Sequence, residues 1–375
     1  MTEELNREAV GIPPMLDDLQ LDDQGLGPEL SHDISLEMTE VVGLSQSQIV
    51  RRRFFRHRGA MISLAVLIFI ILLAVTSVGW GPIPGWWKYS YNELVPQTTN
   101  DGKPTLSLRP EFLGGAGIGL GEHPFGVDNE LGKDMFAQTM RGVQTSLAVI
   151  FVLGILSTSI GVVIGSLSGY YGRFVDSALM RLTDVVIVLP LLVITAVAGF
   201  ALDLGGIWPV AVALGVFTWT GLARLVRAEF LTLRQREFVD AARVANASDR
   251  RIIFKHILPN TVGTIIVSTT LLMGAGILTE AALGFLGFGV RAPEVSLGTL
   301  VNAYDGAYET RPWLFIWPGV FVIAIVLCLQ FIGDGLRDAF DPRQKRVPKR
   351  KDLERGRSDA FDPDAVVFDE PRTTR

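Results

Sequence analysis

The sequence contains little cysteine and little charge for its length of 375 residues. Its single cysteine, Cys328, lies within an apolar run, which excludes an internal disulfide and a thiolate metal cluster. We expect this side chain to be a buried small hydrophobe. Charged residues make up 19% of the chain, against about 25% in soluble domains, and mean hydropathy is +0.35. Together these values favour a membrane protein, and the net charge of −5 indicates no particular partner.

Histidine is also scarce, and none of the four histidines falls within a long apolar run; they are His32, His57, His123 and His256. A Ser–His or Asp–His pair therefore cannot assemble at membrane depth. The stretch 165–169 resembles a nucleophile motif only superficially, because its central residue is Leu167. We expect neither a catalytic site nor a bound metal.

The nearest approach to a phosphate-binding loop runs from Gly126 to Lys133. Its spacing is one residue too long, and Asp134 stands where serine or threonine would hold magnesium. We therefore expect no ATPase site and no cofactor on this chain. The cytoplasmic arginines described below are explained by topology and lipid contact rather than by nucleic acid.

Six apolar runs are each long enough to cross a bilayer, which takes about 20 residues. They cover approximately residues 59–80, 145–168, 185–202, 207–226, 262–283 and 313–332. Residues 203–206 are expected to form a tight hairpin between the third and fourth runs. The predicted fold class is an all-α integral membrane protein, a bundle of six transmembrane helices within a permease domain of residues 49–342.

Lys and Arg predict the orientation, because cytoplasmic segments carry more of them. Five arginines lie between residues 51 and 58, just before the first span, whereas the predicted outside loop 81–140 carries few bases for its length. Both termini are therefore expected in the cytoplasm. Tryptophans gather near the predicted outer edges, as interfacial aromatics do: Trp80, Trp86, Trp87, Trp313 and Trp317.

The two ends of the chain have a different composition from the spans. Residues 1–48 are polar and acidic, with Arg7 as the only Lys or Arg, and show no secretory signal. We expect a disordered cytoplasmic tail, with a docking role as the alternative. Residues 343–375 are expected to form a charged cytoplasmic tail.

Small residues repeat every four positions along the second span, at Ser157, Gly161, Gly165 and Gly169. Such a stripe allows another helix to approach closely. Two acidic residues lie near span ends, where a functional role is the default hypothesis. For Asp184 we expect an ion pair with Arg181, three residues earlier. Glu280 either lines a translocation path or holds the outer loop, and the sequence leaves both alternatives open.

The loop between the fourth and fifth spans, residues 237–260, is the most informative segment. Four apolar residues share one helical face: Phe238, Ala241, Ala242 and Ala245. Asn246 tolerates the left-handed conformation that ends helices, Ser248 is a good N-cap, and Pro259 suits the first turn of the next span. The pattern predicts two short helices that meet at an angle.

This segment resembles the EAA motif of ABC-importer permeases, and Asp240, Ala241, Ala242, Asn246, Leu258 and Pro259 occupy its positions. Asp240 replaces the motif's Glu, Asn246 its Gly, and His256 its usual Ile. Asn remains compatible with a left-handed turn. Residues 51–58, 123–142 and 280–293 also resemble C-type subunits of the dipeptide/oligopeptide/nickel permease family, over about residues 51–342.

The resemblance implies a subunit that forms half of a translocation path for di- or oligopeptides. The implied partners are a homologous B-type permease, two ATP-binding subunits that use ATP, and an extracytoplasmic solute-binding protein. The segment around Asp240–Pro259 would couple the permease to one ATPase at the inner (plasma) membrane of a prokaryote. The alternatives are a permease for nickel or another small solute, and a secondary transporter, which usually shows inverted repeats and midplane charges.

Overall fold

The computed structural model of the protein describes residues 46–95, 101–107, 119–128, 132–201 and 206–341, and these are mostly helical. The predicted tail 343–375, the tail up to residue 45 and most of the predicted hairpin 203–206 lie outside the described residues. α2 (Gln46–Arg56) begins within the segment that we expected to be disordered. The described residues from Ile49 to Asp341 belong to one compact unit.

In the described part of the chain, four helices are long and apolar enough to cross a membrane: α3 (Arg58–Val78), α4 (Met135–Tyr171), α11 (Leu258–Phe285) and α13 (Pro312–Phe340). They cover the first, second, fifth and sixth predicted spans. α4 begins ten residues before the predicted start at 145, because Asp134 caps it by accepting a hydrogen bond from the Ala137 N–H.

The third and fourth spans are broken helices, which the sequence analysis did not predict. α5 (Arg173–Val188) and α6 (Leu191–Ala201) meet at 81°, and α7 (Ile207–Phe217) and α8 (Thr220–Leu233) meet at 40°. Pro190 lacks an N–H and restricts the residue before it, which ends α5. The predicted continuous third span from residue 185 was therefore wrong, and six spans result only when each bent pair counts as one.

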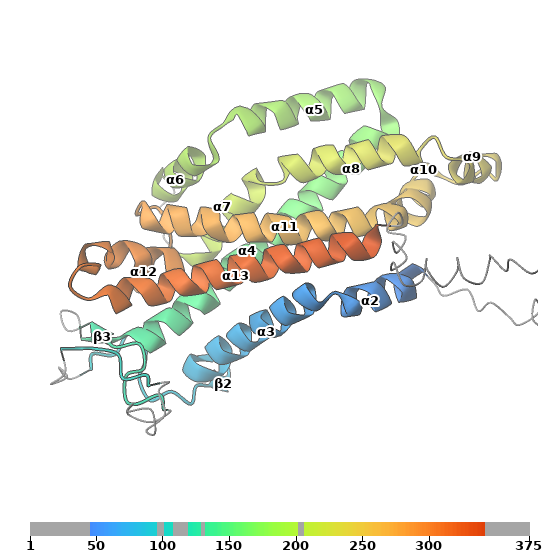
Figure 1. The fold of residues 1–375 in the computed structure, drawn as a ribbon. Helices are drawn as coiled ribbons and strands as arrows, with labels where there is room; N and C mark the ends of the chain where they lie inside the picture. Colours follow the sequence, from blue (N-terminus) through green and yellow to red (C-terminus); the bar gives the residue numbers. More distant parts are fainter. Residues whose placement is uncertain (1–45, 96–100, 108–118, 129–131, 202–205, 342–375) are drawn as a thin grey trace, which may run out of the picture. The chain divides into compact units, whose positions relative to one another are not determined.

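α4 is the central helix of the bundle, in contact with α3, α5, α7, α8 and α11 (Figure 1). α13 packs against α3 and α11, which lie on either side of it. Before α4, the chain forms two antiparallel hairpins: β1 (Gly79–Trp80) with β2 (Ile83–Pro84), and β3 (Val127–Asp128) with β4 (Lys133–Asp134). α12 (Leu297–Ala303) and the 3₁₀ turn Asp305–Ala307 join α11 to α13.

The small residues of α4 face α7 and α8 at very short range. A Cβ atom on Gly165 would lie 2.5 Å from the Ala223 carbonyl oxygen. One on Gly169 would lie 2.5 Å from the Cβ of Phe230, and one on Gly161 would lie 3.1 Å from the Cβ of Leu222. Ser157 donates a hydrogen bond of 2.8 Å to the Gly215 carbonyl. α4 and α8 are therefore in backbone contact at Gly165 and Gly169.

Candidate functional site

The segment between α8 and α11 begins with a short amphipathic helix, α9 (Glu237–Val244). It ends where Asn246 adopts φ +56°, the left-handed conformation expected there. Ser248 occupies the N-cap of α10 (Asp249–Arg251), but its side chain makes no capping bond within the described structure.

The second half of the segment is not the separate short helix that we predicted. α10 continues through a π-helical stretch, η3 (Ile252–Ile257), directly into α11, so that residues Asp249–Phe285 run as one helix. Leu258 and Pro259 lie at the start of α11, and proline is tolerated there because the first turn needs no N–H from it. Continuity makes this half of the segment part of a membrane-spanning element.

The apolar face predicted for α9 is largely exposed. Val239 and Ala242 are the buried residues of the helix, packed in a cluster with Ile252 and Ile257. The other apolar side chains remain uncovered, with Val244 89% and Phe238 40% exposed, and Ala241 and Ala245 exposed as well. We name Phe238, Ala241, Val244 and Ala245 the α9 face. The sequence analysis missed Val244, although its position, three residues after Ala241, makes the two neighbours on the helix surface.

Polar contacts tie this segment to the end of α4. The Tyr170 hydroxyl donates to the Asp249 carboxylate at 2.7 Å, and the Arg234 guanidinium donates to the Tyr170 carbonyl at 2.9 Å. Asp240 accepts from Arg243 at 2.9 Å on the surface of α9. A displacement of α10 therefore acts directly on α4 as well as on α11.

Ion pairs join the broken span α5–α6 to α8. Arg227 binds Asp176 through two nitrogens, at 2.5 and 2.7 Å, and the Ser168 hydroxyl donates to the same carboxylate. Asp184 accepts from Arg224 of α8 at 2.7 Å. The predicted partner Arg181 was wrong, because α5 lies against α8 and directs this carboxylate across to it.

Glu280 lies where three helices meet on the predicted outer side. Its side chain is fully buried, and one carboxylate oxygen accepts a 2.8 Å hydrogen bond from Ser146 of α4. The Ser146 oxygen in turn accepts from the Leu297 N–H at the start of α12. Glu280 thus links α11 to α4 and to the loop element α12. Its role in lining a translocation path stays a prediction.

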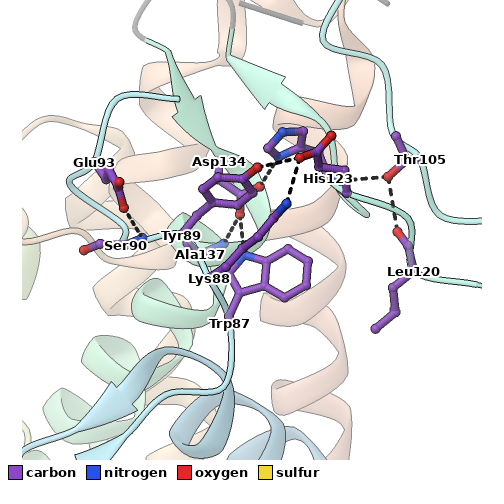
Figure 2. A network of polar contacts seen from close by, with 11 residues as sticks. Trp87, Lys88, Tyr89, Ser90, Glu93, Thr105, Leu120, His123, Asp134 and Ala137 are labelled. Atoms are coloured by element: carbon purple, nitrogen blue, oxygen red, sulfur yellow. Dashed lines mark hydrogen bonds and ion pairs between the residues drawn. The ribbon is translucent and has the colours of Figure 1, made fainter. Parts of the chain in front are cut away.

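A polar network holds the loop before α4 together (Figure 2). The buried carboxylate of Asp134 receives the Trp87 indole N–H at 3.0 Å and the Ala137 N–H at 2.8 Å, and its second oxygen lies 2.7 Å from Nδ1 of His123. The Tyr89 ring stacks on the His123 ring, with 4.7 Å between the ring centroids. Two separate stretches of the loop, around Trp87 and His123, therefore converge on the N-cap of α4.

An exposed pair extends this network at the surface. Lys88 donates to Glu122 at 2.7 Å, and the Tyr89 hydroxyl donates to the same carboxylate at 2.8 Å. The bond from Lys88 lowers the pKa of Glu122, and the bond to Glu122 raises the pKa of Lys88.

Two family profiles match the chain: the binding-protein-dependent transport system inner membrane component over residues 161–346, and the N-terminal transmembrane domain of oligopeptide transport permease C over residues 45–107. The oligopeptide transport system permease protein OppC of Mycobacterium tuberculosis is 35% identical over 311 residues, covering 83% of this chain and 98% of that protein. The chain belongs to the binding-protein-dependent transport permeases.

Further relatives of the permease carry similar names. OppC of Haemophilus influenzae is 35% identical, covering 83% of this permease and 93% of that protein. A putative peptide permease of Brucella ovis is 37% identical, covering 78% and 89% respectively. A solved structure of the MetNI methionine ABC transporter, in inward-facing conformations, aligns with a TM-score of 0.45 and 22% identity over 53% of this permease and 94% of that chain.

The features described above fall into different matched ranges of the permease. The α9 face, the Asp176–Arg227 pair and Glu280 lie within residues 161–346, whereas Trp87 and Lys88 lie within residues 45–107. Asp134 lies between the two matched ranges. The network around Asp134 thus joins the N-terminal matched range to the start of α4, which lies between the two ranges.

Asp134→Ala is expected to destabilise the permease measurably. The change removes the helix cap, worth about 1 kcal/mol, and leaves the buried Trp87 and His123 nitrogens without their acceptor, which costs about 1–3 kcal/mol more. Thermal unfolding of the purified chain in detergent measures the loss. Glu122→Gln in the exposed pair is the control and should unfold at the wild-type temperature, so equal stability of Asp134→Ala and Glu122→Gln would show that the network is not structural.

Proposed function

We propose that this permease is one half of the translocation path of an ATP-driven importer of di- and oligopeptides. The α9 face carries the proposal: it is an apolar surface on a polar segment between two spans, within the segment that resembles the EAA motif. An isolated apolar patch of this kind marks a protein contact site. The names of the relatives from Mycobacterium, Haemophilus and Brucella support peptides as the cargo.

The proposed assembly contains a homologous B-type permease, two ATP-binding subunits and an extracytoplasmic solute-binding protein. ATP is bound and used by the partner subunits, and this chain contributes no cofactor site. The arginines of residues 51–58 and the bases around α9 support a cytoplasmic location for both termini and for the α9 face. The location is the prokaryotic inner (plasma) membrane.

The coupling follows from the continuity of the helices. When an ATP-binding subunit that is bound to the α9 face changes conformation, it moves α9 and α10 together, because the short turn at Asn246 joins them. The helix Asp249–Phe285 is about 55 Å long at about 1.5 Å per residue and carries that displacement to Glu280. There the bonds to Ser146 and α12 pass it to α4 and the outer loop. ATP thus biases a two-state gate from a distance.

The test uses Val244→Glu, which replaces the most exposed apolar side chain of the α9 face by a charge. We expect wild type to co-purify from detergent-solubilised membranes with a second permease and two ATP-binding subunits, and the variant to lose only the ATP-binding subunits. A buried charge without a partner is strongly unfavourable at such an interface. Gln235→Glu, exposed in the turn before α9, is the matched control and should keep all partners.

The outcomes separate the competing proposals. Retention of the ATP-binding subunits by Val244→Glu would show that the α9 face is not the docking surface. If the wild-type chain purified alone and moved solute in liposomes, the chain would be a secondary transporter and the importer proposal would be wrong. Uptake of nickel instead of peptides by the complete complex would keep the importer and replace its cargo.

A further inference from the structure

The breaks in the two bent spans line the same cavity. The cavity has a volume of about 290 Å³ and is bounded on one side by the α5–α6 break and on another by the α7–α8 break. The third wall is α11. Among its lining residues are Leu189, Leu191, Thr218, Thr220, Ala275 and Thr279.

Helix breaks within a span are costly in lipid, since each helix end leaves backbone N–H and carbonyl groups without an intrahelical partner. The end of α5 is followed by Pro190, and the start of α8 at Trp219 receives no side-chain capping bond within the described part of the chain. Broken helices persist at membrane depth where protein or a water-filled cavity covers them. A pair of interrupted spans facing each other is characteristic of a substrate site in transporters.

The walls of the cavity define what it can bind. All the described residues that line it are uncharged, and most are aliphatic. Thr279 donates its hydroxyl proton to the Ala275 carbonyl at 3.1 Å, so its oxygen remains available as an acceptor. The Thr218 hydroxyl donates to the Leu214 carbonyl at 2.8 Å and also bonds to the Ser157 hydroxyl. A hydroxyl oxygen can accept from the amide N–H of a peptide main chain, and aliphatic walls accept varied apolar side chains.

We propose that this cavity is the section of the peptide path that this subunit contributes, and that it holds the main chain of an uncharged stretch of peptide between the two helix breaks. The inference rests on the proposed function, because it names residues that contact the same cargo. Glu280, which is not among the lining residues of the cavity, acts in this arrangement by holding α12 and not by touching peptide.

Cysteine labelling in the assembled complex tests the cavity. Cys328→Ser removes the only cysteine of the chain, and this buried residue does not line the cavity. Ala275→Cys and Thr279→Cys then place a thiol in the cavity, whereas Leu278→Cys places one at a half-exposed position of α11 that does not line the cavity. The thiols are labelled with a cationic, water-soluble methanethiosulfonate reagent. The two measurements are the labelling rate and the ATP-driven uptake of tri-alanine into proteoliposomes.

We expect the cavity thiols to react at least about tenfold faster than the Leu278→Cys thiol, since a thiol in lipid stays protonated and only the thiolate reacts. Excess tri-alanine should slow the reaction at Ala275→Cys, and labelling there should abolish uptake. Equal labelling rates at positions 275 and 278, or uptake that continues after labelling at 275, would overturn the proposed path. Failure of the wild-type complex to take up tri-alanine would instead overturn the peptide cargo itself.

Discussion

Gly165→Ala is expected to lower the unfolding temperature of the permease sharply and to reduce its amount in the membrane. The added Cβ would lie 2.5 Å from the Ala223 carbonyl oxygen, 2.8 Å from the Val226 Cβ and 3.0 Å from the Arg227 nitrogen. Two of these three are backbone atoms, which cannot rotate away as a side chain can. α4 and α8 must therefore separate along the stripe, at a cost of about 3 kcal/mol or more.

Two other glycines of the bundle provide matched controls for the same methyl addition. No described atom lies within 4 Å of a Cβ built on Gly221, so Gly221→Ala should be neutral or slightly stabilising. At Gly154 the added carbon meets the flexible side chain of Met273 at 2.9 Å, so an intermediate loss is expected. Thermal unfolding of the three purified variants gives the order, and identical midpoints for Gly165→Ala and Gly221→Ala would contradict close packing of α4 on α8.

Arg227→Ala is expected to have the second-largest effect. It leaves the Asp176 carboxylate, whose side chain is only 19% exposed, with the Ser168 hydroxyl but without its cation. Breaking a fully buried pair costs about 3–5 kcal/mol, and because the Arg227 side chain is 32% exposed we expect about 2–3 kcal/mol here. The α5–α6 span would lose its bidentate attachment to α8.

A double variant separates the lost pair from general damage. Asp176→Asn with Arg227→Met removes both charges and should recover most of the stability lost in Arg227→Ala. The Asp184–Arg224 pair is the matched control, because its side chains are 49% and 45% exposed and Arg224→Ala should cost about 1 kcal/mol or less. Equal losses for Arg224→Ala and Arg227→Ala in denaturant unfolding would contradict this ranking.

The positions of the spans could be predicted from the sequence, because long apolar runs follow directly from the thickness of a bilayer. Hydropathy did not predict the break at Pro190, because an average over many residues is insensitive to the loss of one backbone hydrogen-bond donor. The turn at Asn246 was predictable because the left-handed conformation depends on the residue itself. The extension of α10 into α11 was not, since it depends on a π-helical stretch supported by packing against α9.

The candidate sites show the same division between local and long-range information. The α9 face was recognisable from its spacing, but its exposure could only be seen once Val239 and Ala242 were found to supply the buried side. Asp184 was paired with Arg181 because a single helix suggests only its own neighbours. The convergence of Trp87 and His123 on Asp134 was missed, although an aspartate just before a long apolar helix is a readable capping signal.

The break at Pro190 also has a consequence for how the chain enters the membrane during synthesis. α6 and α7 have 11 residues each, or about 16 Å of helix, half of a hydrocarbon core of about 30 Å. Neither helix can partition into lipid alone as it leaves the ribosome. We therefore expect the insertion machinery to retain residues 173–233 until α8 has emerged, and to release the whole stretch as one unit.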